Sequence, residues 1–128
     1  MLALVMASSC NNKKEEMSMK IEWSDEIVMP DINGKENYGT AGAYIGINNN
    51  HLLIAGGAFF PDGLPWRGGK KFWSKDVYAL DINSVPNTWK VLKDKLPQAI
   101  AYGSSVSTPK GILCIGGNDA EKCYDNTY

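Results

Sequence analysis

The residues best suited to chemistry lie in one stretch, Ala58 to Lys75, which combines aromatic rings with cationic side chains. An aromatic face can stack on a sugar ring, and a guanidinium or ammonium group can hold a carboxylate. The candidates for the carboxylate are Arg67, Lys70 and Lys71, and those for stacking are Trp66 and Trp73. The alternative is that the aromatic rings cover the edge of a sheet and that the charges are solvated.

Other kinds of chemistry have weaker support. His51, the single histidine, follows three asparagines in a hairpin turn, which favours an exposed turn residue over a catalytic base. No cluster of His, Cys and carboxylate residues has the spacing of a metal site, and no nucleotide-binding motif is present, so no metal and no cofactor are predicted. In an exported protein Cys114 and Cys123 could pair across a hairpin, or remain thiols. A formal net charge of −1 argues against nucleic acid as a partner.

The chain repeats one pattern of strand, turn, strand and glycine pair, first over 42–57 and again over 103–117. Gly56 and Gly116 lie 60 positions apart, and such a period indicates repeated supersecondary units. Alternating side chains predict a further strand at 76–81, and Trp89 marks a short fourth one. Strands are therefore expected near 42–47, 51–56, 76–81, 88–92, 103–107 and 111–116, with another beginning by the C-terminus and negligible helix.

This order resembles the kelch repeat, the four-stranded blade of a β-propeller. The predicted fold is all-β, with about two four-stranded blades of a six-bladed ring: blade one over 38–97 and an incomplete blade two over 98–128. The connection from Gly57 to Tyr78 is ten residues longer than that from Gly117 to Tyr128. The extra residues fall in the stretch that carries the candidate chemistry.

The N-terminal residues 1–19 are expected to lie outside the propeller. An apolar run ending in Ala7-Ser-Ser-Cys10 resembles the end of a bacterial lipoprotein signal, and a polar tether follows. We therefore expect lipidation at Cys10 and a place in the bacterial cell envelope, facing the periplasm or the cell surface. The membrane would be a partner through this anchor only. The alternative is a short apolar start with an incidental cysteine.

Residues 20–30 are expected to form a closing strand, the last strand of a blade whose other strands lie elsewhere. Trp23 precedes Pro30 by seven positions, much as Trp89 precedes Pro97 by eight. Pairing the first strand of a propeller with its last blade removes two exposed edges. The final residues 126–128 repeat the register of 76–78. We therefore expect an N-terminal piece of a longer propeller, whose missing blades are its partners.

The chain from about Trp23 to Tyr128 resembles the N-acetylneuraminate epimerase (sialic acid mutarotase) family, in its cyclically permuted branch. The matching segments are 42–46 with 52–57, 70–76 with its Lys70-Lys71-x-Trp73-Ser74 core, and 101–103 with 112–117. The resemblance implies interconversion of the α and β anomers of sialic acid or a related sugar by acid-base ring opening, without a cofactor. A non-catalytic kelch module that binds glycan or protein is the alternative.

The resemblance also implies where catalytic groups lie. The catalytic Glu of the family would fall beyond residue 128, and Ala58 and Asn118 occupy the equivalent places in the two blades. The Arg that the family carries before Ala-Tyr-Gly is Ile100 here. Residues 1–128 alone are therefore expected to be inactive.

Overall fold

The computed structural model describes residues 19–23, 27–30, 37 and 39–128. The first repeated unit begins with the antiparallel strands β1 (Tyr44–Asn48) and β2 (His51–Ala55). Asn49 and Asn50 form the turn between them, with φ values of 46° and 60°. Asparagine tolerates this left-handed conformation better than most residues, which suits a two-residue hairpin.

Blade one is a four-stranded sheet in the order β1-β2-β5-β6. Strand β5 (Val77–Asp81) pairs with β2, and β6 (Trp89–Leu92) pairs with β5, in each case antiparallel. All four strands agree with the strands expected from the sequence to within two residues at either end. Alternation places the largest side chains of β5, Tyr78 and Leu80, on one face, where both are buried.

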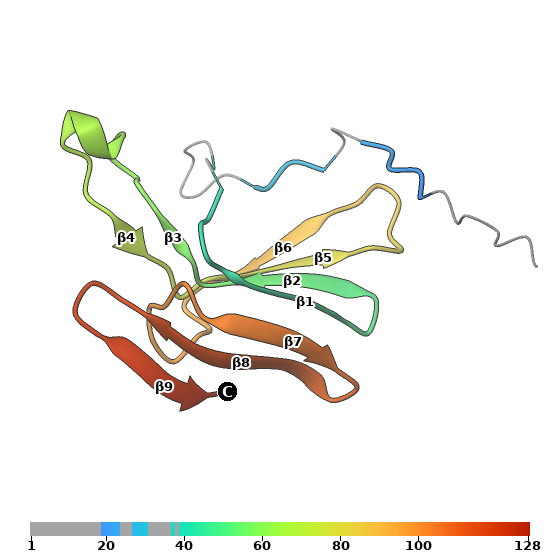
Figure 1. Cartoon of the computed structure of the whole chain (residues 1–128). Coiled ribbons are helices and arrows are strands. Elements are labelled where there is room, and N and C mark those ends of the chain that lie inside the picture. Colours follow the sequence, from blue (N-terminus) through green and yellow to red (C-terminus); the bar gives the residue numbers. More distant parts are fainter. Residues whose placement is uncertain (1–18, 24–26, 31–36, 38) are drawn as a thin grey trace, which may run out of the picture.

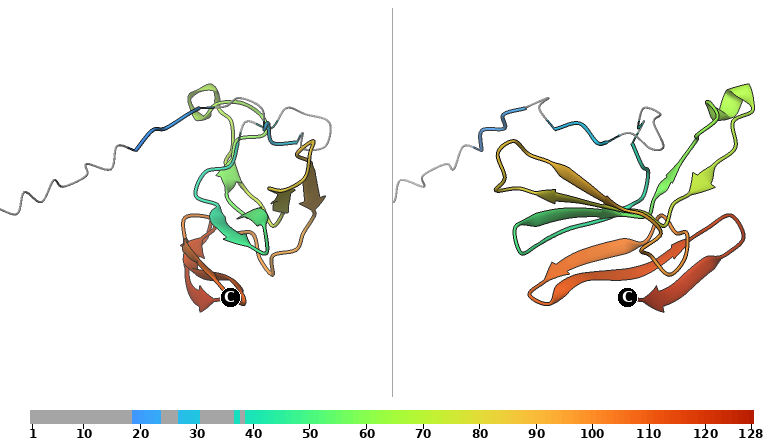
Figure 2. Two further views of the ribbon diagram at one scale, coloured as in Figure 1. Left: turned by 90° about the vertical axis from the view of Figure 1, so that its right-hand side faces the viewer. Right: turned by 180° about the vertical axis from the view of Figure 1, so that it is seen from behind.

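Blade two repeats the arrangement with three antiparallel strands, β7 (Ser104–Thr108), β8 (Gly111–Asn118) and β9 (Cys123–Thr127). Figures 1 and 2 show the two sheets lying one against the other, with β1 beside β7. Among the described residues, the helical content is a single 3₁₀ turn, η1 (Pro65–Arg67). The expected all-β fold of kelch-type propeller blades is confirmed.

The seam between the blades is closed by serine side chains. The Ser105 hydroxyl accepts the backbone N–H of Ile45 at 2.9 Å and donates to its carbonyl at 2.8 Å. The Ser107 hydroxyl accepts the N–H of Ile47 at 2.9 Å. Each bond joins residues 60 positions apart, so the seam follows the sequence repeat. The hydroxyls give partners to backbone groups on the edge of β1.

A small core lies between the blades at the start of β1, directly beside the Ser105 contact. Its buried members are Tyr44, Ile100 and Cys114, and Leu96 and Tyr124 pack against them. The Tyr44 hydroxyl donates to the carbonyl of Gly116.

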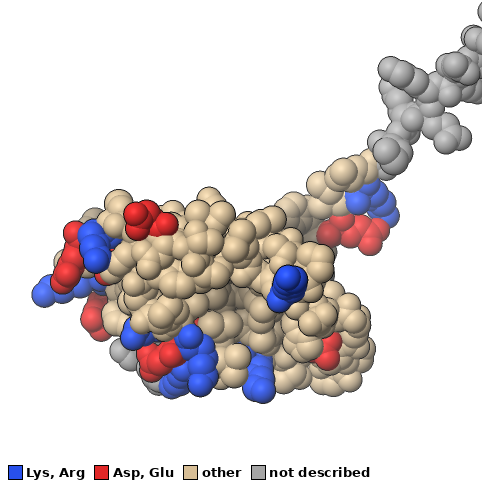
Figure 3. Space-filling model, turned by 90° about the horizontal axis from the view of Figure 1, so that it is seen from below, with Lys and Arg blue, Asp and Glu red and all other residues tan. Residues whose placement is uncertain are grey.

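Each sheet has exposed apolar residues on the face that points away from the other blade. Ile45 and Ile47 of blade one are 53% and 52% exposed, and Val106, Leu113 and Ile115 of blade two are also exposed. Seen from the side of blade two, much of the surface is uncharged, and most of the charged side chains gather toward one end and the lower edge of the view (Figure 3). Exposed apolar sheet faces of this kind pack against neighbouring blades in a propeller.

The structure adds one feature that the sequence did not predict. A short hairpin of β3 (Ala58–Phe59) and β4 (Phe72–Trp73) rises from the end of blade one. Two-residue strands are too short for alternation to reveal them, so this stretch was expected only as a long loop.

Several predictions about the N-terminal part remain predictions. Cys10 and the rest of residues 1–18 lie outside the described residues. The described parts of the expected closing strand, 20–23 and 27–30, form no strand here, and Trp23 is 92% exposed. Within the described ranges, no helix is long and apolar enough to span a membrane.

The sequence left open whether Cys114 and Cys123 form a disulfide or remain thiols, and the structure decides between the two. Cys114 and Cys123 are free thiols, the first buried and the second exposed. Burial raises the pKa of the Cys114 thiol, which disfavours the reactive thiolate.

Candidate functional site

The hairpin of β3 and β4 is anchored firmly at its base. The N–H of Ala58 donates to Ala41, and the N–H of Ala41 donates back to Ala58, both at 2.8 Å. The N–H of Ser74 donates to the Gly57 carbonyl at 2.9 Å, while the buried Ser74 hydroxyl accepts the N–H of Asp76. These bonds fix where the side chains of Phe59, Lys71 and Trp73 emerge.

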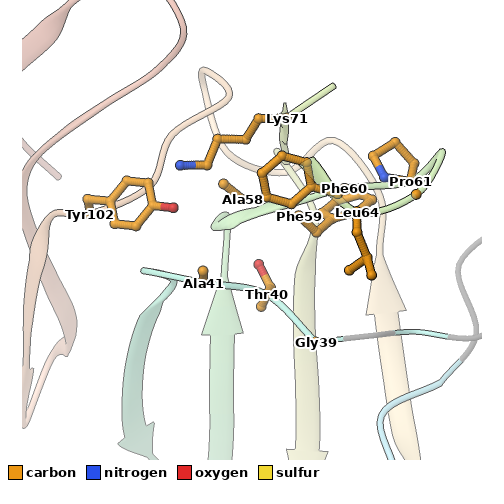
Figure 4. Close-up of a pocket in the computed structure, with 11 residues that line it drawn as sticks. Gly39, Thr40, Ala41, Ala58, Phe59, Phe60, Pro61, Leu64, Lys71 and Tyr102 are labelled. Atoms are coloured by element: carbon orange, nitrogen blue, oxygen red, sulfur yellow. The ribbon is translucent and has the colours of Figure 1, made fainter. Parts of the chain in front are cut away.

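A pocket of about 740 Å³ opens between this hairpin, the segment before β1 and the turn before β7 (Figure 4). Its wall is mostly apolar, with a lysine and a tyrosine at one side. The lining residues are Gly39, Thr40, Ala41, Ala58, Phe59, Phe60, Pro61, Gly63, Leu64, Lys71 and Tyr102. This volume and an apolar wall with few polar groups are typical of small-molecule sites.

Lys71 is held at the pocket by aromatic rings. Its Nζ lies 4.4 Å from the ring centroid of Tyr102 and 5.3 Å from that of Trp73. Within the part of the chain that the structure describes, no carboxylate forms an ion pair with it. Cation–π contacts hold an ammonium group without neutralising it, so the pocket presents a positive charge to a ligand.

Trp73 connects the hairpin to blade two. Its Nε1–H donates to the Asn118 side-chain oxygen at 3.4 Å, a long hydrogen bond between residues 45 positions apart. Asn118 is itself fixed, because its N–H and carbonyl pair with Ala101. The bond therefore orients the indole beside Lys71.

The structure brings together two of the five predicted binding residues, Lys71 and Trp73. Trp66 and Arg67 lie in η1 at the tip of the hairpin, where Trp66 is 76% exposed, and Lys70 is exposed on the segment leading back. Of the five, Lys71 lines the pocket and the other four do not, and the binding role of all five stays a prediction.

Sequence reasoning missed Tyr102, Thr40 and Asn118 as site residues. Asn118 directly follows the second glycine pair, as Ala58 follows the first, and this repeat position was a usable signal. Tyr102 lies between Ala101 and Gly103 in the segment that leads into β7. A large aromatic residue between two small ones was the sequence signal that could have identified it.

Two other residues considered at the sequence level lie away from the pocket. His51 is exposed at the opposite end of blade one, as predicted, with Nδ1 2.8 Å from the Asn49 carbonyl. Ile100 is 1% exposed at the joint between the blades, and its carbonyl accepts the N–H of Gly57 at 2.8 Å. Among the described residues, no three His, Cys, Asp or Glu gather where a metal could bind.

The fold defines a class, kelch-type β-propeller blades, here with a pocket on the connections at one end that is lined by aromatic residues and a lysine. The chain belongs to the N-acetylneuraminate epimerase family, whose model matches residues 7–126.

Relatives named N-acetylneuraminate epimerase include one from Yersinia pestis (strain Pestoides F), 37% identical over 112 residues, which cover 76% of this chain and 26% of the relative. One from Brucella melitensis is 37% identical over 109 residues, covering 77% and 27%. A solved structure described as "Structure of YjhT" matches with a TM-score of 0.61 and 30% identity, over 78% of this chain and 29% of that one. This chain thus spans about a quarter of the length of these relatives.

Proposed function

We propose that this chain is part of a sialic acid mutarotase, which interconverts the α and β anomers of N-acetylneuraminate. The observation that carries the proposal is the Lys71 ammonium, unpaired among the described residues and held between Trp73 and Tyr102 at an apolar pocket. Membership of the N-acetylneuraminate epimerase family supports the substrate.

The chemistry of the sugar fits the groups of the pocket. N-acetylneuraminate carries a carboxylate, which suits Lys71, and a pyranose ring, which suits the aromatic side chains of the pocket wall. Its N-acetyl methyl group suits the apolar wall of Phe59 and Phe60.

Ring opening needs a base for the anomeric hydroxyl and an acid for the ring oxygen. The lining residues include no carboxylate and no histidine. We therefore propose that the acid-base groups come from further blades of a longer chain, and that residues 1–128 alone bind weakly and do not catalyse.

The test is an NMR measurement of anomer exchange with the full-length protein. We expect catalysed exchange in the wild type and none with residues 1–128. Lys71→Met should raise KM by roughly tenfold or more, because a hydrogen bond to a charged group is lost. Lys110→Met is the control, since Lys110 lies at the β7–β8 turn, away from the pocket. Exchange at the uncatalysed rate would overturn the proposal.

The absence of acid and base from the described wall also favours a second candidate, a non-catalytic module that binds a glycan or a protein. Binding of N-acetylneuraminate without accelerated exchange would select this candidate as a glycan-binding module.

We further propose export and lipidation at Cys10, supported by the apolar run before Ala7-Ser-Ser-Cys10. Metabolic labelling with a lipid precursor should mark the wild type and not Cys10→Ala. Label retained in that variant would count against the anchor.

A further inference from the structure

Tyr102 occupies a backbone conformation that a bulky residue rarely adopts. Its φ is +61°, in the left-handed region. The residues on both sides constrain this backbone conformation. Ala101 is 1% exposed and forms two backbone hydrogen bonds with Asn118. A Cβ at Gly103 would lie 2.5 Å from the Tyr44 ring. Strain of this kind persists where the surroundings impose it, often at ligand sites.

The same contacts aim the tyrosine side chain. The Tyr102 N–H donates to the Gly42 carbonyl at 2.7 Å. A Cβ on Gly42 would lie 2.4 Å from Cδ1 of the ring, so the ring packs where Gly42 has no side chain. Figure 4 shows the Tyr102 hydroxyl directed toward the other pocket residues and the Lys71 side chain reaching toward Tyr102.

The Tyr102 hydroxyl is available to a ligand. The residue is 45% exposed, and the described part of the chain offers its hydroxyl no hydrogen-bond partner. Glycine or asparagine would adopt this backbone at lower cost, and neither would supply a phenol. The backbone strain at Tyr102 thus accompanies a phenol placed at the pocket.

We propose that Tyr102 is a ligand-contacting residue that completes an anion subsite with Lys71, and that Gly42 is its positioning residue. Lys71 supplies the charge, and the Tyr102 hydroxyl donates a directional hydrogen bond to the same carboxylate. The ring face meanwhile holds the ammonium group 4.4 Å from its centroid. This inference rests on the proposed function for the identity of the ligand, a sugar carboxylate, and it adds a residue and a division of roles.

The test is a calorimetric binding titration of the full-length protein with N-acetylneuraminate and with its uncharged C1 carboxamide. Tyr102→Phe keeps the ring, its packing on Gly42 and the contact with Lys71. We expect it to weaken binding of the acid by roughly tenfold to a hundredfold, because one hydrogen bond to a charged group is lost. Binding of the carboxamide should change much less, and the thermal midpoint should be kept.

A double-mutant cycle with Lys71→Met should show coupling, since both groups hold one carboxylate. Gly42→Ala should also weaken binding of the acid, because it displaces the ring without removing the hydroxyl. Gly111→Ala is the matched control: its φ is +149°, and a Cβ there would meet nothing within 4 Å.

An equal loss for acid and carboxamide in Tyr102→Phe, or no loss, would overturn the inference, even if Gly42→Ala failed to fold. A wild type that does not bind the acid would also overturn it. Binding with the expected pattern but without catalysed anomer exchange would support the subsite and reject the mutarotase.

Discussion

Blade one and blade two share a hairpin that ends on a glycine pair, and they differ in the connection that leaves this pair. After Gly57 the chain builds a second hairpin that leaves Lys71 without an anionic partner among the described residues. After Gly117 it makes a tight loop whose polar groups satisfy one another. Asp119 accepts the N–H groups of Glu121 and Lys122 and the hydroxyl of Tyr124.

The two repeats thus share the strands of the blade and differ in the connection that follows the glycine pair. A loop whose polar groups bond to one another stabilises its own turn, and few of those groups remain free to bind a ligand. A long connection on a rigid sheet can present groups whose partners come from outside.

The largest expected effect tests whether the two glycine pairs are equivalent. Gly56 and Gly116 have similar φ values, +67° and +63°, but a Cβ at Gly56 would lie 2.5 Å from the Ile100 carbonyl oxygen. At Gly116 the nearest neighbour of a Cβ would be the Tyr124 carbonyl oxygen at 3.2 Å. We expect Gly56→Ala to lower the free energy of unfolding by roughly 3–5 kcal/mol and Gly116→Ala by about 1–2 kcal/mol.

Urea unfolding of the purified chain measures both values. Equal losses would show that Gly116 is as closely packed as Gly56 and would remove this difference between the blades.

A smaller effect tests the seam. Ser105→Ala removes a hydroxyl that bonds both backbone groups of Ile45, and we expect a loss of about 1–2 kcal/mol in the free energy of unfolding. Ser104→Ala is the matched control on the same strand, because Ser104 is exposed, and we expect a change within about 0.5 kcal/mol. Equal effects of the two substitutions would contradict the role given to the seam.

The smallest effect on stability tests the tight loop of blade two. The hydrogen bond to Asp119 is the main cause that raises the pKa of Tyr124 to about 12 from an ordinary 10.0. A raised pKa means that this contribution is complete below pH 10 and is lost as the pH rises toward 12. Asp119→Asn should return the ionisation of Tyr124 toward 10.0 in an ultraviolet absorbance titration, with Tyr124→Phe identifying the signal.

For Asp119 the sign is the opposite. The Tyr124 hydroxyl, followed by the N–H groups of Glu121 and Lys122, lowers the pKa of its carboxyl below 3.8. Its contribution is therefore present above the ordinary pKa and is lost as the pH falls through the lowered value. A Tyr124 pKa unchanged in Asp119→Asn would contradict the bond.

The strands of both blades were predictable because alternation, turn residues and the repeat all agree over 44–55 and 104–117. The pocket was only partly predictable. Lys71 and Trp73 were visible as a cation and an indole in a long connection, whereas Tyr102 joins the site through the packing of blade two on blade one. That packing depends on contacts 45 to 60 positions apart, which local patterns do not encode.

The serine seam also bears on the order in which blades can assemble. Ser105 and Ser107 of blade two accept hydrogen bonds from backbone N–H groups on the edge of β1. At the same repeat positions, blade one carries Ile45 and Ile47. A blade with isoleucines there cannot offer hydroxyls to the edge strand of a neighbour. Two blades built on one repeat are thus not interchangeable, and a pair docked in reversed order would leave edge N–H groups without these partners. The side chains of two serines thus stabilise this order of the two blades and not the reversed one.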